Sequence, residues 1–214
     1  HAGYTSMSFS PYTVNGHIFS GVGIDLMPEG KWKLSALYGR FLKAVEADTT
    51  RRNVPGFQRM GYALKASYGA GSNTLDIVLF HAEDDKHSIR IPADSLQITP
   101  HENLVVSVGA SRSLLKNFII RGELATSALS RDVRARETTN AHLLARSGVF
   151  FKPRLSSSYY QAFKSSLDYQ NNGWVMGIGY ERVDPEYRTL GAYYFNNDLE
   201  NFTLNTSGGF RENK

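Results

Sequence analysis

Apolar residues alternate strictly with polar or small residues between Arg59 and Gly69. One set contains Met60, Tyr62, Leu64, Ala66 and Tyr68, and the other contains Arg59, Gly61, Ala63, Lys65, Ser67 and Gly69. Successive side chains of a β-strand point to opposite faces of a sheet. The pattern therefore predicts a strand with one apolar face and one polar face, which suits lipid on one side and water or polar groups on the other.

The same alternation recurs in seven further segments, at residues 18–26, 32–39, 75–79, 104–111, 118–128, 159–169 and 174–181. No comparable window shows the 3.6-residue period of an amphipathic helix. A tilted membrane-spanning strand needs about ten residues. We expect about ten or eleven such strands in a single domain over residues 1–214.

The composition excludes several classes of protein. The chain of 214 residues contains no cysteine, so it has neither disulfides nor thiolate metal ligands. No apolar run approaches the roughly 18 residues of a membrane helix. The net charge of +4 is small and dispersed, and no basic stretch interleaves with aromatic residues, so we expect no nucleic-acid binding.

The expected connections differ in length. Long polar segments lie at Val45–Phe57, Glu83–Pro100 and Ser130–Asn140, whereas the connections at 69–73 and 114–117 are short. Long loops at one end and short turns at the other are typical of an up-and-down membrane barrel. The tight Asn-Asn-Gly turn at Gln170–Gly173 interrupts the alternation, because a long loop is due there. We expect the three long loops to lie together at one end of the strands.

The fold predicted is an all-β, antiparallel up-and-down transmembrane β-barrel. Barrels of the outer membrane typically finish on an aromatic residue, but here Arg211–Lys214 follow Phe210. We therefore expect a partial barrel that belongs to a longer chain, with its first and last strands pairing with other segments or chains.

Two sets of residues are candidates for function. The polar residues expected to face the lumen are Lys65, Asp76, Arg121, Glu123, Lys164, Asp168 and Glu181. Buried charges are costly unless they are paired or wet, so a salt-bridge network is preferred here over a selectivity surface. The aromatic residues expected at the membrane interface are Trp32, Tyr62, Tyr68, Trp174 and Tyr180. An exposed apolar band is expected from Tyr62, Leu64, Ala66, Leu104, Val106, Ile120, Leu124, Met176 and Ile178.

Three stretches carry a resemblance to known proteins. They read D-I-V-L-F-H-A-E-D-D-K-H-S from Asp76, G-E-L-A-T-S-A-L-S-R-D from Gly122, and E-R-V-D-P-E-Y-R-T-L-G-A-Y-Y-F-N-N-D-L-E-N from Glu181. The chain resembles large, mostly uncharacterised outer-membrane β-barrel proteins of Bacteroidota. The resemblance implies a location in the bacterial outer membrane and an internal segment of a longer barrel. It implies no catalytic residue.

One cluster has residue types that bind metals. His81, Glu83, Asp84, Asp85 and His87 lie close together in sequence. The spacing of an EF-hand is absent, and so is a helical two-histidine spacing. We expect His81 on a strand, the acidic residues at the start of a solvated loop, and neither a metal nor another cofactor.

The leading functional hypothesis is a non-enzymatic outer-membrane β-barrel that acts in porin-like transport or as an envelope-assembly component. One alternative is a scaffold subunit of an outer-membrane secretion or surface-display complex. A second is an outer-membrane lipid hydrolase, with His142 or His81 as the base for a serine. A third, a soluble lipocalin-like carrier, is disfavoured because its apolar residues should face inward. The expected partners are outer-membrane lipid and other barrel segments or envelope proteins.

Overall fold

The computed structural model describes residues 2–47, 53–90, 98–138, 150–171 and 173–208. The strands are β1 (Ala2–Ser8), β2 (Val14–Leu26), β3 (Trp32–Leu42), β4 (Gln58–Ala70), β5 (Asn73–Asp85), β6 (Glu102–Leu114), β7 (Phe118–Ser130), β8 (Ser157–Asn171), β9 (Trp174–Val183), β10 (Gly191–Ala192) and β11 (Leu199–Gly208). No helix occurs in these ranges, and the all-β prediction is confirmed.

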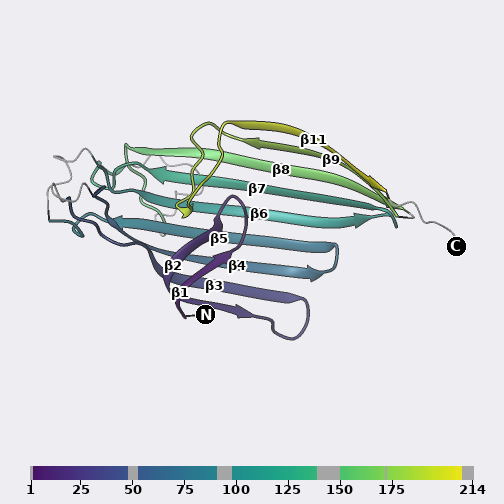
Figure 1. Ribbon diagram of the computed structural model, residues 1–214, viewed down its shortest axis with the longest axis horizontal. Coiled ribbons are helices and arrows are strands. Elements are labelled where there is room, and N and C mark those ends of the chain that lie inside the picture. The colour runs from purple at the N-terminus through teal and green to yellow at the C-terminus, as the bar shows by residue number, and fades with distance from the viewer. Residues whose placement is uncertain (1, 48–52, 91–97, 139–149, 172, 209–214) are drawn as a thin grey trace.

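All eleven strands belong to one sheet. Along the path β1-β2-β3-β4-β5-β6-β7-β8-β9-β11, every pair of neighbours is antiparallel, which confirms the up-and-down topology (Figure 1). The short strand β10 lies off this path and pairs with β2 in parallel. Within the described residues β1 and β11 end the sheet without pairing with each other, so this sheet is not closed.

The long and short connections lie at opposite ends of the strands. The long ones span residues 43–57, 86–101 and 131–156, and the short ones span 71–72, 115–117 and 172–173. Because neighbouring strands are antiparallel, the long loops share one end, as expected. Two expectations about these connections were wrong. Strand β5 continues to Asp85, and the strand that follows and pairs with β7 is β8, which begins at Ser157, so the turn at Gln170–Gly173 belongs to the short set. The predicted end of the third long loop, Asn140, lies outside the described residues.

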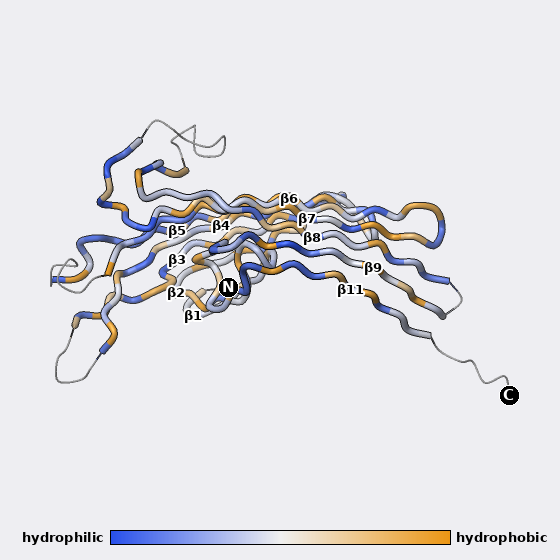
Figure 2. Tube along the Cα trace, turned by 90° about the horizontal axis from the view of Figure 1, so that it is seen from above, coloured by the Kyte–Doolittle hydropathy of each residue, from blue (hydrophilic) through white to orange (hydrophobic). Residues whose placement is uncertain are grey.

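The register defines two faces of the sheet. Leu37, Ala63, Phe80 and Val105 pair in one row across β3 to β6 and therefore share one face of the sheet. We call this face the inner face. The opposite face, with Leu64, Ile77, Val108 and Ile120, is the outer face. Figure 2 shows that the sheet is curved, with β1 and the start of β2 on its hollow side, which is the inner one.

Glycines allow the sheet to bend between β2 and β4. Gly21, Gly39 and Gly61 pair in one row across these strands. A Cβ atom on Gly39 would lie 2.7 Å from the Ser20 carbonyl oxygen and 2.8 Å from Cδ2 of Phe19. Such contacts are too close for any side chain, so glycine is required where β2 leaves β3 and crosses the inner face.

Two segments cover the half of the inner face that lies toward the long loops. The first is the N-terminal turn, residues 9–13, and the second is the crossing segment, residues 184–198, which leaves β9 and returns as β11. Tyr12 and Tyr187 are each only 1% exposed, and they pack in one hydrophobic cluster with the sheet residue Phe80. This part of the inner face is therefore a dry core.

Candidate functional site: the charged inner face

The seven polar residues predicted to face a lumen all project from the inner face. Asp76, Glu123, Lys164 and Glu181 belong to one row, linked by the register across β5 to β9 through Gly109 on β6. The other three are Lys65, Arg121 and Asp168, and the register places them on the same face. The alternation in the sequence thus identified a common face correctly. That this face borders a lumen stays a prediction.

Four of these residues form ion pairs across neighbouring strands. Arg121 pairs with Asp168, and Lys164 Nζ lies 3.7 Å from Oε2 of Glu181. The Arg121 and Lys164 side chains are about half exposed. Ion pairs that remain accessible to water contribute little to stability. These pairs neutralise four of the seven predicted charges of the inner face and add little to its stability.

Three of the predicted residues hold the N-terminal turn. Lys65 Nζ donates a 3.0 Å hydrogen bond to the Phe9 carbonyl oxygen. The Ser10 hydroxyl donates to Glu123. The Tyr12 hydroxyl donates to Oε1 of Glu181 at 2.6 Å. Burial raises the pKa of Tyr12, and its hydrogen bond to Glu181 raises it further, so this phenol stays a donor at neutral pH.

The crossing segment is held by buried hydrogen bonds to the turn. The Tyr187 hydroxyl donates to the Tyr12 carbonyl oxygen at 2.9 Å, and the Thr189 hydroxyl donates to the Thr13 carbonyl oxygen at 2.6 Å. Burial also raises the pKa of Tyr187 above its ordinary value. The parallel pairing of β10 with β2 adds backbone contacts at the same place. The turn and the crossing segment therefore form one unit on the inner face.

The same unit is hydrogen-bonded to the sheet below it. Asn103 Oδ1 accepts a 2.9 Å bond from the Leu190 N–H, and Asn103 Nδ2 donates to the Ser127 hydroxyl oxygen at 2.8 Å. The Ser127 hydroxyl in turn donates to the Arg188 carbonyl oxygen at 2.6 Å. Asn103 and Ser127 are fully buried, and buried networks whose members are satisfied favour a single arrangement. The alternation over residues 118–128 places Ser127 on the polar face, but it did not indicate that Ser127 or Asn103 holds another segment.

The half of the inner face toward the short turns is an open polar hollow of about 430 Å³. Its polar lining includes Thr74, Asp76, Ser111, Arg121, Glu123, Lys164 and Ser166. The inner face thus has two parts: a dry half filled by the chain itself, and a wet half lined by charges of both signs.

The five predicted interface aromatics all lie on the outer face. Trp32 and Tyr68 are in contact near the short turns, with ring centroids 4.9 Å apart. Trp174 begins β9 at the same end. Tyr62 lies toward the long loops and contacts His81, while Tyr180 packs on Phe202. These positions suit two aromatic margins of an apolar band, although contact with a membrane interface stays a prediction.

Most of the predicted apolar band is accessible. Leu64, Ile120, Leu124, Met176 and Ile178 are each between 43% and 58% exposed, while Tyr62, Ala66 and Val106 are partly buried. The expectation was wrong for Leu104, which is 2% exposed. Phe151, from the third long connection, packs over it in a small cluster with Ala128. Covering by a loop cannot be read from the strand pattern.

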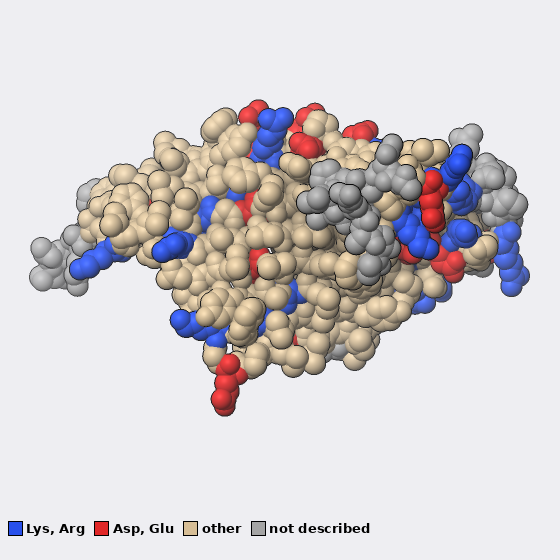
Figure 3. Space-filling view, turned by 180° about the vertical axis from the view of Figure 1, so that it is seen from behind, with Lys and Arg blue, Asp and Glu red and all other residues tan. Residues whose placement is uncertain are grey.

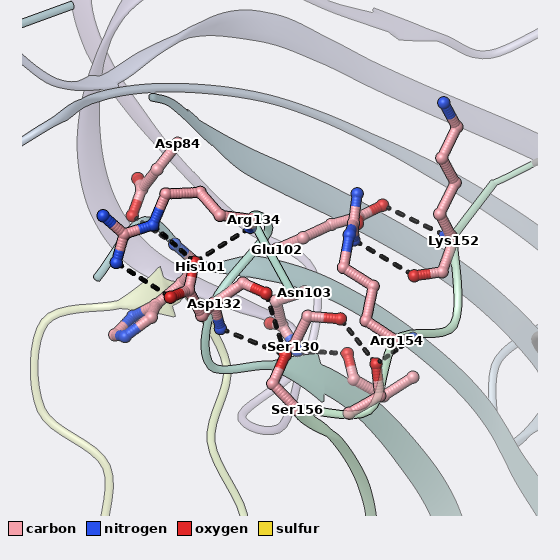
Figure 4. A network of polar contacts seen from close by, with 12 residues as sticks. Asp84, His101, Glu102, Asn103, Ser130, Asp132, Arg134, Lys152, Arg154 and Ser156 are labelled. Carbon is pink, nitrogen blue, oxygen red and sulfur yellow. Dashed lines mark hydrogen bonds and ion pairs between the residues drawn. The ribbon is translucent and has the colours of Figure 1, made fainter. Parts of the chain in front are cut away.

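Strand β5 continues through the acidic cluster as far as Asp85, so successive residues of the cluster point to opposite faces of the sheet. Asp84 points to the inner side, where it forms a bidentate ion pair with Arg59 and accepts a 2.9 Å hydrogen bond from the His101 N–H. His81 and Glu83 point to the outer side, where they meet Glu102 of β6. Glu102 is paired with Arg154 as well (Figure 4). His87 lies beyond the strand and is exposed, and His142 lies outside the described residues.

No family model, curated protein or solved structure matches this chain significantly. The part of the chain that the structure describes contains no helix long and apolar enough to cross a membrane.

Proposed function

We propose that this chain forms part of the wall of a non-enzymatic outer-membrane β-barrel. The observation that carries the proposal is the outer face. On β4 to β9, every exposed large hydrophobic side chain lies on that face. They are Leu64, Tyr68, Leu75, Ile77, Val108, Leu114, Ile120, Leu124, Phe163, Trp174, Met176 and Ile178.

The distribution of charge supports a lipid contact. From Tyr62 to Tyr68 on β4, Leu75 to Leu79 on β5, and Leu104 to Ala110 on β6, the outer positions carry no Asp, Glu, Lys or Arg. In Figure 3 the visible part of this face is mostly tan with a few scattered charged residues, and the larger groups of charge lie at the long-loop end and around the margins. Soluble monomers rarely expose a continuous apolar surface of this kind.

The charged half of the inner face, toward the short turns, supports the same proposal. Apolar residues on one side of an antiparallel sheet and charges on the other are the arrangement of an outer-membrane wall. A lipocalin-like carrier would place its apolar side chains inside and its polar side chains in water, which is the reverse of the outer face found here. Closure into a barrel would pair the free edges of β1 and β11, either with each other or with further segments.

A role in envelope assembly is favoured over an open pore. The long-loop half of the inner face is filled by the N-terminal turn and the crossing segment, which bury Tyr12, Tyr187 and Leu190 against the sheet. A dry core of this kind leaves no water path through that half. We propose a scaffold or anchoring subunit, whose partners are outer-membrane lipid and other barrel segments or envelope proteins.

Membrane fractionation with gel migration tests the location. The full chain should sediment with the outer membrane, resist extraction by carbonate, and migrate differently on gels before and after heating in detergent. Recovery in the soluble fraction without detergent would contradict the membrane proposal. Planar-bilayer recordings test the assembly role, because the folded chain should show no steady conductance. A stable ohmic pore would favour transport instead.

A further inference from the structure

Three side chains on the outer face, near the long loops, have the donor atoms of a metal site. They are His81 and Glu83 of β5 and Glu102 of β6. Each offers one nitrogen or oxygen atom, and these three atoms all lie within 4.8 Å of one another. The residues come from two strands, because Glu83 pairs directly with Glu102 in the register and His81 lies two residues away on the same face.

The pairing of two glutamates calls for a positive partner. Like charges directly opposite each other on neighbouring strands destabilise a sheet. Arg154 provides one positive charge, but its ion pair is with Glu102. Glu83 is an exposed residue that lies beside this pair, and Lys152 is a further positive charge near it. A divalent cation between Glu83 and Glu102 would remove the repulsion that remains.

The distance between two of the donor atoms suits a tetrahedral metal. His81 Nε2 lies 3.3 Å from Oε1 of Glu102, and the two atoms form a hydrogen bond. Two ligand atoms bound at roughly 2.0 Å to a tetrahedral zinc ion are about 3.3 Å apart. The exposed Glu83 can reach the same point by rotating its side chain, since its carboxylate is not enclosed by other groups in the way that Glu102 is.

Arg154 has the position of a group that orients a metal ligand. It pairs with Oε2 of Glu102, whereas Oε1 of the same carboxylate faces His81. Carboxylates that bind metals are commonly held by a second hydrogen-bonding partner of this kind. Both Arg154 and Glu102 are buried, so the Glu102 carboxylate is fixed in place before any cation arrives.

We propose that His81, Glu83 and Glu102 bind a divalent transition-metal cation of the zinc type. One imidazole nitrogen with two carboxylates favours zinc over calcium, which prefers six or more oxygen ligands. Three protein donors leave the fourth position to water. The cation would join β5 to β6 and, through Arg154, secure the segment whose Phe151 covers Leu104. The proposal does not depend on the membrane assignment.

Zinc titration of the purified full chain tests this site. After treatment with a chelator, the chain is titrated with zinc chloride by calorimetry, and its melting temperature is measured with and without zinc. We expect one zinc ion per chain and a higher melting temperature. His81→Gln and Glu83→Gln should each weaken zinc binding at least tenfold. His87→Gln is the matched control, because this exposed histidine belongs to the same stretch of sequence but not to the site, and it should bind zinc as the wild type does.

Cobalt spectroscopy gives an independent readout. Cobalt(II) in place of zinc should give the visible absorption bands of a four-coordinate site, and His81→Gln should remove them. Glu102→Gln would break the ion pair with Arg154 and disturb folding. Glu83 is not part of that ion pair, so a loss of metal binding in Glu83→Gln reports on the site itself. Equal zinc affinity in His81→Gln, Glu83→Gln and His87→Gln would show adventitious surface binding and overturn the proposal. Calcium binding as tight as zinc binding would overturn the assigned class of metal.

Discussion

Tyr12 and Glu181 are 169 residues apart in the sequence, and the Tyr12 hydroxyl donates a 2.6 Å hydrogen bond to the Glu181 carboxylate. This contact links the N-terminal turn to a charged residue of β9. Glu181, which was expected to line a lumen, therefore holds the N-terminal turn in place on the inner face.

Removing the Tyr12 hydroxyl should destabilise the filled interior. Tyr12→Phe leaves Glu181 without this donor, and a hydrogen bond to a partly exposed carboxylate contributes about 1–2 kcal/mol. We expect the free energy of unfolding, measured by urea titration in detergent, to fall by that amount. Tyr4→Phe is the control, because Tyr4 is 80% exposed. Equal stability of the two variants would show that the contact holds nothing in place.

A charge on the outer face should be costly in a bilayer. Leu64 lies in the middle of β4 and is 51% exposed. If lipid covers it, Leu64→Arg should lower the free energy of unfolding in lipid vesicles by roughly 2–4 kcal/mol. Ser67→Arg places the same side chain on the inner face of the same strand and should cost much less. Equal costs for both variants would argue against lipid on the outer face.

The glycine row should tolerate no side chain where β2 bends away. Gly39→Ala would force contacts below 3.0 Å with backbone atoms, and overpacking of this kind costs about 1–3 kcal/mol. Gly109→Ala is the matched control, because the nearest atoms to its new Cβ would lie at 3.8 Å. We expect Gly39→Ala alone to lower the melting temperature. A neutral Gly39→Ala would mean that the bend does not depend on close approach of the strands.

Lowering the pH should decrease the stability of the folded chain through His101, which lies at the long-loop end of the sheet. Its pKa is lowered from 6.5, chiefly by burial, so the folded chain binds this proton less readily than the unfolded chain does. The stability that this histidine contributes is therefore present above the unfolded pKa and is lost as the pH falls below it. We expect the free energy of unfolding to decline as the pH falls below about 6.5. His101→Gln should reduce that decline, and the exposed His87→Gln should not. A pH profile unchanged by His101→Gln would contradict the assignment.

The strand pattern predicted much of the candidate site. Alternation placed Lys65, Arg121 and Glu181 on one face and Leu64 and Ile178 on the other, and the register bears out both groupings. It did not predict that Asn103 and Ser127 hold the crossing segment, because a polar residue at an inward position looks the same whether it faces water or holds another segment.

The residues that we propose as zinc ligands show the same limit of the strand pattern, which does not identify contacts between strands. Residues next to one another in sequence, such as Glu83 and Asp84, lie on opposite faces of β5, because the pleat separates them. Glu102 is 19 positions from Glu83 in the numbering, yet the antiparallel register brings the two together. Proximity in the sequence therefore pointed to Glu83 but not to Glu102 as a neighbour of His81.

The sequence by itself determined the class of the fold and the character of its two faces, because both follow from a two-residue period that each strand carries locally. Only the tertiary structure decided what covers each face. The crossing segment fills half of the inner face, and Phe151 covers Leu104, because loops are placed by contacts with distant strands. Those contacts depend on the register and curvature of the whole sheet, which no single segment specifies.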